Sequence, residues 1–147
     1  MRLRNLTLCI ITVATILGMF LSCQSQEELD MRNYLSNGRS LYEVKCRNCH
    51  GEQGEGLGEL APPLTDSLSL KKKKKQLSCI IKNGLEGEIQ VHGKVYNEKM
   101  PAFTELTDME VAQLIVYITN SFGNSQGHYP YNRVTEDLKN CPSSAQL

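Results

Sequence analysis

Apolar residues recur with a helical period in three stretches of the chain, residues 34–44, 70–83 and 108–120. The last of these has the spacing i, i+3, i+4, i+7 that is typical of an amphipathic helix. Three such stripes predict helices that bury one face each in a common core, and therefore an all-α fold. The apolar positions are Tyr34, Leu35, Leu41, Tyr42 and Val44, then Leu70, Leu77, Ile80 and Ile81, and finally Val111, Leu114, Ile115 and Ile118.

Polar residues and glycine mark the ends of these helices. Ser67 or Ser69 is the predicted N-cap of the second helix, and Gly84 is the residue that ends it. Thr107 and Glu110 have the spacing of a capping box, in which each side chain bonds the other residue's backbone N–H. The third helix is therefore predicted to begin at Asp108.

Residues 85–96 have no helical period. Their apolar residues flank His92-Gly93, which predicts a small hairpin or an extended loop with a tight turn. Met100 follows and stands directly before Pro101. Because a residue before proline is biased away from helix, Met100 is expected on an extended loop.

The first 22 residues have the pattern of an export signal. Arg2 and Arg4 precede an apolar run that is shorter than an ordinary membrane span. The end of the run, Ser22-Cys23, resembles a bacterial lipoprotein cleavage site, which implies a lipid on Cys23. The alternative is an uncleaved membrane anchor. Residues 23–33 are polar and acidic and are predicted to form a tether.

The chain has 16 basic and 16 acidic side chains, and removal of residues 1–22 takes away two arginines, so the remainder carries a net charge of about −2. This balance gives no basic field of the kind that nucleic-acid binding requires. The length of 147 residues indicates one folded domain.

The sequence Cys46-Arg47-Asn48-Cys49-His50 has the C-x-x-C-H pattern of covalent c-type haem attachment. On one helical turn the two thiols can bond the two haem vinyl groups, while His50 reaches the iron as proximal ligand. A zinc site or a redox dithiol is less favoured, because the chain has no second Cys pair and no βαβ pattern.

Gly38 and Tyr42, ahead of Cys46, resemble the first helix of a class I cytochrome c, and Leu114 with Tyr117 resembles the final helix that crosses it. The resemblance covers roughly residues 34–122. It implies the cytochrome c fold, with three to four helices around one covalently bound haem c, for a domain at 34–123. Residues 124–147 would form an extension pinned to that domain, with a short helix at 136–140 capped by Thr135.

Pro62 stands twelve residues after His50. In the family that this offset resembles, the proline carbonyl accepts the Nδ1–H of the proximal histidine. Leu64 would then pack on the haem, and Met100 would be the distal ligand. Met31 is expected in the tether and Met109 in a helix, which makes them poor competitors. His92 and His128 are lesser candidates, because each is more often a surface residue than a ligand.

Six cysteines can be assigned by elimination. Cys9 belongs to the signal, Cys23 to the lipid site, and Cys46 with Cys49 to the haem. The remaining pair, Cys79 and Cys141, is predicted to form a disulfide in an exported chain. Alternatively, Cys79 is a buried free thiol, or Cys141 pairs between molecules.

Five consecutive lysines, Lys71–Lys75, wrap the predicted second helix. Lys73 or Lys74 must lie near its apolar stripe and extend its ammonium to water. The run has two possible interpretations: an electrostatic docking site for an acidic redox partner, or a solvated helix face.

Together these patterns predict a monomeric, lipid-anchored, single-haem electron carrier, not an enzyme, that is exported to the cell envelope and faces the periplasm. It would pass electrons between membrane redox complexes. The alternatives are a haem subunit of a peroxidase, nitrite reductase or terminal oxidase, or a ligand-binding haem sensor. Catalysis or ligand sensing at iron needs a vacant or displaceable distal position, which a methionine ligand would occupy.

Overall fold

The computed structural model describes residues 4, 5, 7, 8, 10–13 and 26–142. The chain divides into two units, Met1–Asp30 and Met31–Leu147. In the first unit the described residues are helical. Among the described residues, no helix has both the length and the apolar character needed to cross a bilayer. The predicted lipid site, Cys23, lies outside the described residues.

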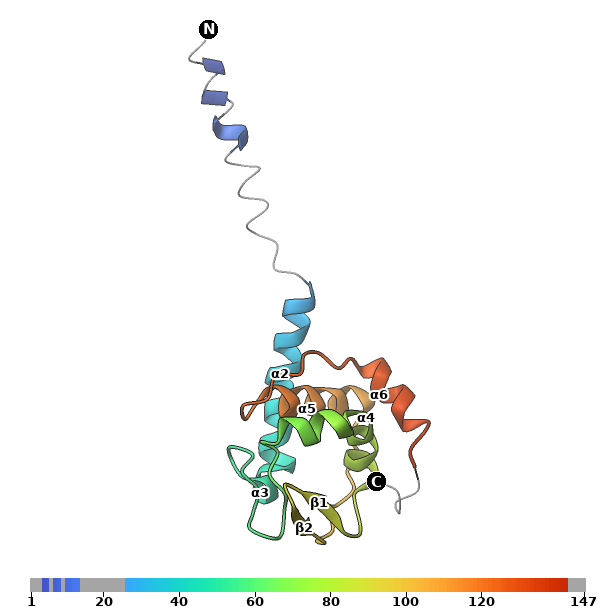
Figure 1. The fold of residues 1–147 in the computed structure, drawn as a ribbon. Coiled ribbons are helices and arrows are strands. Elements are labelled where there is room, and N and C mark those ends of the chain that lie inside the picture. The colour runs from blue at the N-terminus through green and yellow to red at the C-terminus, as the bar shows by residue number, and fades with distance from the viewer. Residues whose placement is uncertain (1–3, 6, 9, 14–25, 143–147) are drawn as a thin grey trace. The chain divides into compact units, whose positions relative to one another are not determined.

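Helices dominate the second unit, and one two-stranded sheet completes it (Figure 1). Helix α2 (Gln26–Lys45) begins in the first unit and continues into the second. The other elements are α3 (Arg47–His50), α4 (Ser67–Asn83), β1 (Ile89–Val91), β2 (Lys94–Tyr96), α5 (Asp108–Asn120) and α6 (Tyr131–Leu138). The antiparallel strands pair Ile89 with Tyr96 and Val91 with Lys94. This is the hairpin alternative for residues 85–96, and His92 at its turn has φ +52°.

Helix α5 is the centre of the core and packs against α4 and α6. Its residues Val111, Leu114 and Ile115 are at most 1% exposed. The predicted capping box is confirmed, since Glu110 N–H donates to Thr107 Oγ1 at 3.3 Å and Thr107 N–H donates to Glu110 Oε2 at 2.7 Å. The helix therefore starts where the sequence predicted.

Helix α2 touches α5 at Gly38. A Cβ at this position would lie 2.1 Å from the carbonyl oxygen of Gln113. One turn later, Tyr42 packs against Tyr117 with ring centroids 5.4 Å apart. The small residue thus permits a backbone approach that any side chain would prevent.

Three predicted boundaries are wrong. Residues 26–33 of the expected tether are helical and belong to α2. The N-cap of α4 is Asp66, because its carboxylate accepts the N–H groups of Leu68 and Ser69, at 3.1 and 3.0 Å. A carboxylate also suits the positive end of the helix dipole, which favours Asp66 over the two serines.

The last helix begins at Tyr131 rather than at residue 136. Pro130 precedes it with extended backbone, and a fixed proline φ is compatible with the start of a helix. Thr135, the predicted cap, lies inside the helix and donates its hydroxyl to Asp108. The extension is thereby joined to the first turn of α5.

A disulfide joins Cys79 of α4 to Cys141, just beyond α6, with the two Cα atoms 5.6 Å apart. Nearby, the side chain of Asp137 accepts hydrogen bonds from the hydroxyls of Ser78 and Tyr129. The C-terminal extension is therefore pinned to α4 by a covalent bond and by the partly buried hydrogen bond between Ser78 and Asp137.

Candidate haem-attachment site

The C-x-x-C-H segment forms one short helix, α3, with Cys46 as its N-cap. The N–H of His50 donates to the carbonyl of Cys46 at 2.9 Å, so both cysteines and the histidine lie within a single turn. Tyr42 donates its hydroxyl to Gly51 O at 2.6 Å and fastens the end of this turn to α2. Cys46 and Cys49 are not joined to each other by a disulfide.

His50 is held by the residue that the family resemblance implied. Its Nδ1 lies 3.0 Å from the carbonyl oxygen of Pro62. Since proline offers only an acceptor there, Nδ1 carries the proton and Nε2 keeps its lone pair. Burial lowers the pKa of His50, against the opposing effect of the Pro62 hydrogen bond. The imidazole is therefore neutral at physiological pH, the form that binds a metal.

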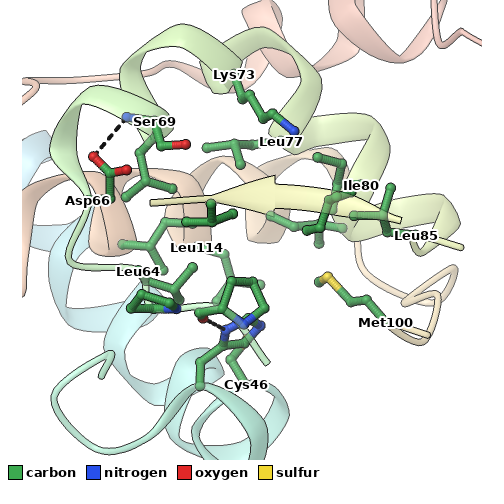
Figure 2. Close-up of a pocket in the computed structure, with 18 residues that line it drawn as sticks. Cys46, Leu64, Asp66, Ser69, Lys73, Leu77, Ile80, Leu85, Met100 and Leu114 are labelled. Carbon is green, nitrogen blue, oxygen red and sulfur yellow. Dashed lines mark hydrogen bonds between the residues drawn. The ribbon is translucent and has the colours of Figure 1, made fainter. Parts of the chain in front are cut away.

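Two adjoining cavities meet at His50. The larger is lined predominantly by apolar side chains, as cofactor sites commonly are. Both are lined by Cys46, His50, Pro62, Leu85, Ile89 and Met100. The larger is also lined by Leu64 and by the apolar faces of α4 and α5, among them Leu77, Ile80 and Leu114 (Figure 2).

Met100 extends its thioether into this pocket from the loop after β2 (Figure 2). The loop is extended at this point, as the following proline predicted. Met100 and Leu85 exchange two backbone hydrogen bonds, of 2.9 and 3.1 Å. Gly84 makes room for this bridge, because its φ is +76° and a Cβ there would lie 2.6 Å from Met100 O.

One end of the pocket is polar, which the sequence alone did not indicate. Asp66, Ser69 and Lys73 line it from the first turns of α4 (Figure 2). His92, at the hairpin turn, places Nε2 3.3 Å from an Asp66 carboxylate oxygen. His128 instead packs edge-on against Tyr34, with ring centroids 4.5 Å apart. Neither histidine lines the pocket.

The donor set fits a covalently attached haem and does not fit zinc or a redox dithiol. Burial, and then the neighbouring Cys49, raise the pKa of Cys46 to about 12, so its thiol is not a reactive thiolate at neutral pH. No group of three or more His, Cys, Asp or Glu side chains suited to a metal ion occurs in the described part of the chain. An apolar cavity with a thiol pair and a neutral imidazole suits the attachment of haem c, and the thioether of Met100 faces the same cavity.

These features define a c-type cytochrome with one haem-attachment motif. Residues 33–118 match the family described as cytochrome c oxidase, cbb3-type, subunit III, and the chain belongs to that family. It is 30% identical over 95 residues to cytochrome c-552 of Thermus thermophilus, a match that covers 62% of this chain and 72% of that protein. A second cytochrome c-552 sequence from Thermus thermophilus also matches at 30% identity over 95 residues, with 62% of this chain and 64% of that protein covered.

The chain is also similar to the crystal structure of the c-type cytochrome XoxG from Methylobacterium extorquens AM1. The TM-score is 0.42 and the identity 24%, over 72% of this chain and 66% of that one. The family assignment gives the protein the cytochrome c fold, a covalently bound haem c and a role in electron transfer.

Sequence reasoning missed several residues that support the site. Asn124, buried after α5, donates its side-chain amide to the carbonyls of Leu64 and Ile118, both at 2.8 Å. Lys82 donates to two carbonyls of the loop that follows Met100. All of these contacts except the one between Asn124 and Ile118 join residues 22 or more positions apart, so no local pattern predicts them.

Proposed function

We propose that this cytochrome is a lipid-anchored one-electron carrier whose haem iron is ligated by His50 and Met100. The observation that carries the proposal is the placement of a neutral imidazole, fixed by Pro62, and a thioether on the walls of one apolar pocket. Haem c supplies the exchange of a single electron between its two iron oxidation states when it is bound.

The residues of this chain would serve that exchange in three ways. Cys46 and Cys49 would hold the haem covalently, and His50 is already oriented by Pro62 before the haem is attached. Met100 is an uncharged sulfur ligand of the kind that raises the potential of haem iron. The apolar walls exclude water, which keeps the rearrangement that accompanies electron transfer small. Two protein ligands leave no open position for substrate, so we infer a carrier and not an enzyme.

The ligand assignment is tested by Met100→Ala in the haem-loaded protein. The oxidised wild type is expected to show the weak far-red band of sulfur-to-iron ligation, and the variant is expected to lack it. Met109→Ala is the matched control, because Met109 lies in the first turn of α5 and does not line the pocket. A bis-histidine spectrum of the wild type would contradict the assignment.

The proposed anchor rests on the sequence alone. An apolar run that ends in Ser22-Cys23 supports export and lipid attachment at Cys23. The acyl chains would hold the domain at a periplasmic membrane face, where it could meet membrane redox complexes as donor and acceptor.

The family description favours a second candidate, in which the protein is a haem subunit of a larger oxidoreductase. The two candidates differ in assembly, because a carrier dissociates from its partners and a subunit does not. Mild detergent extraction followed by size-exclusion chromatography distinguishes them. We expect a monomeric haem protein. Stoichiometric co-elution with an oxidase would establish the second candidate.

A further inference from the structure

The loop that presents Met100, residues 100–106, is fastened to the C-terminal end of α4. We call it the methionine loop. Its first residue is bridged to Leu85, and Phe103 N–H donates to Ile81 O at 3.0 Å. Beyond Phe103, the loop turns toward α5 and ends at Leu106, which is 4% exposed. The first half of the loop is thus held by backbone hydrogen bonds.

In the second half, one side chain bonds two backbone carbonyls. Lys82, in the last turn of α4, donates its ammonium to Thr104 O at 2.9 Å and to Leu106 O at 2.5 Å. Hydrogen bonds from a charged donor are stronger than neutral ones. Lys82 does not line the pocket, so it can act on a haem ligand only through the loop.

Two other lysines near the loop make contacts of a different kind. Lys45 pairs with Glu105 at 2.7 Å, and the carboxylate side chain is 56% exposed. Lys99 pairs with Glu86, and both of these side chains are more than 60% exposed. Exposed ion pairs contribute little to stability. Lys82 instead donates to two backbone carbonyls, and its bond to Leu106 O is partly buried while its bond to Thr104 O is exposed. These two charged hydrogen bonds therefore carry most of the polar attachment of this half of the loop.

We propose that Lys82 is a positioning residue, which keeps the methionine loop closed and so retains Met100 at the iron. This inference rests on the proposed ligation by Met100. When the loop opens, Met100 leaves the pocket and an external ligand can take its position. The apparent affinity for such a ligand therefore rises in proportion to the open fraction.

The test is an imidazole titration of the oxidised, haem-loaded protein, followed by loss of the far-red band. Lys82→Met keeps the length of the side chain and removes the donors. We expect it to tighten apparent imidazole binding about tenfold, which corresponds to about 1.4 kcal/mol in the closing equilibrium. Lys82→Arg, which restores a charged donor, is expected to recover most of the wild-type affinity. Lys75→Met, at an exposed position of the same helix, serves as the control and should leave the titration unchanged.

Equal imidazole affinity in Lys82→Met and the wild type overturns the positioning role, while a far-red band in both leaves the Met100 assignment intact. Absence of the band from the wild type overturns the proposed ligation itself. If Lys82→Met does not yield haem-loaded protein, Lys82→Gln decides the matter by the same titration. Tightening that Lys82→Arg fails to reverse would contradict the requirement for a charged donor.

Discussion

Replacement of Gly38 by alanine has two effects of opposite sign on the stability of the protein. In a helix interior, alanine is intrinsically more favourable than glycine by about 0.8–1.0 kcal/mol. The new Cβ, however, would lie 2.1 Å from the carbonyl oxygen of Gln113 and 2.8 Å from the Cβ of Tyr117. Ordinary contact begins at 3.4 Å, so at their point of contact the helices must separate by about 1.3 Å, the difference between 3.4 and 2.1 Å.

Overpacking of this kind costs about 1–3 kcal/mol. The upper part of that range applies because the two nearest atoms, Gln113 O and C, belong to backbone that cannot rotate away. When the gain in helix propensity is subtracted from this cost, Gly38→Ala should lower the free energy of unfolding by about 1–2 kcal/mol. Urea unfolding of the haem-loaded protein, followed by far-ultraviolet circular dichroism, measures the change. Ser36→Ala, exposed on the same helix, should be neutral or slightly stabilising. A Gly38→Ala protein as stable as Ser36→Ala would refute the account of the α2–α5 contact.

Three further predictions concern the rest of the chain. Reduction of the Cys79–Cys141 disulfide, which closes a separation of 62 residues, should lower stability by up to about 4 kcal/mol in the chain-entropy treatment; alkylation of both thiols without reductant, detected by intact mass, would contradict the bond. Cys23→Ser should release haem-loaded protein into the soluble fraction, whereas a variant that stays in the membrane would indicate an uncleaved span. Glutamate at the three exposed positions of the lysine run 71–75 should slow association with an acidic partner at low salt if the run docks partners; unchanged rates would favour a solvated face.

In the structure, only three of the five lysines in the run 71–75 are available to contact a partner. Lys74 donates to Gln126 O at 3.0 Å and lies over the ring of Tyr129, 5.2 Å from its centroid. Lys73 lines the polar end of the pocket. Both side chains lie against the protein, as the wrapping of five lysines around one helix required. Only Lys71, Lys72 and Lys75 are exposed for contact with a partner.

Local patterns predicted much of this molecule. The capping box of α5, the extended backbone at Met100 and the single turn of the C-x-x-C-H segment each follow from residues within a few positions of one another. The family resemblance added the contact between His50 and Pro62. These are short-range or recurrent features, and one sequence is sufficient to find them.

The errors arose where tertiary contacts override local preference. Residues 26–33 are polar enough to suggest a tether, yet they continue α2, and Met31 within them packs against the core. Thr135 resembles an N-cap, but its hydroxyl instead contacts Asp108 of α5. The hydrogen bonds from Lys82 reach Thr104 and Leu106, which lie 22 and 24 positions further along the chain. No local pattern could therefore have revealed them.

We propose that one haem, held by His50 and Met100, exchanges one electron without gaining or losing a ligand. A spectroelectrochemical titration of the purified protein measures this directly. We expect low-spin spectra in both oxidation states, a far-red band in the oxidised form, and a single transition with a slope of about 59 mV per tenfold change in the ratio of oxidised to reduced protein. A high-spin, five-coordinate spectrum in either state would contradict the claim.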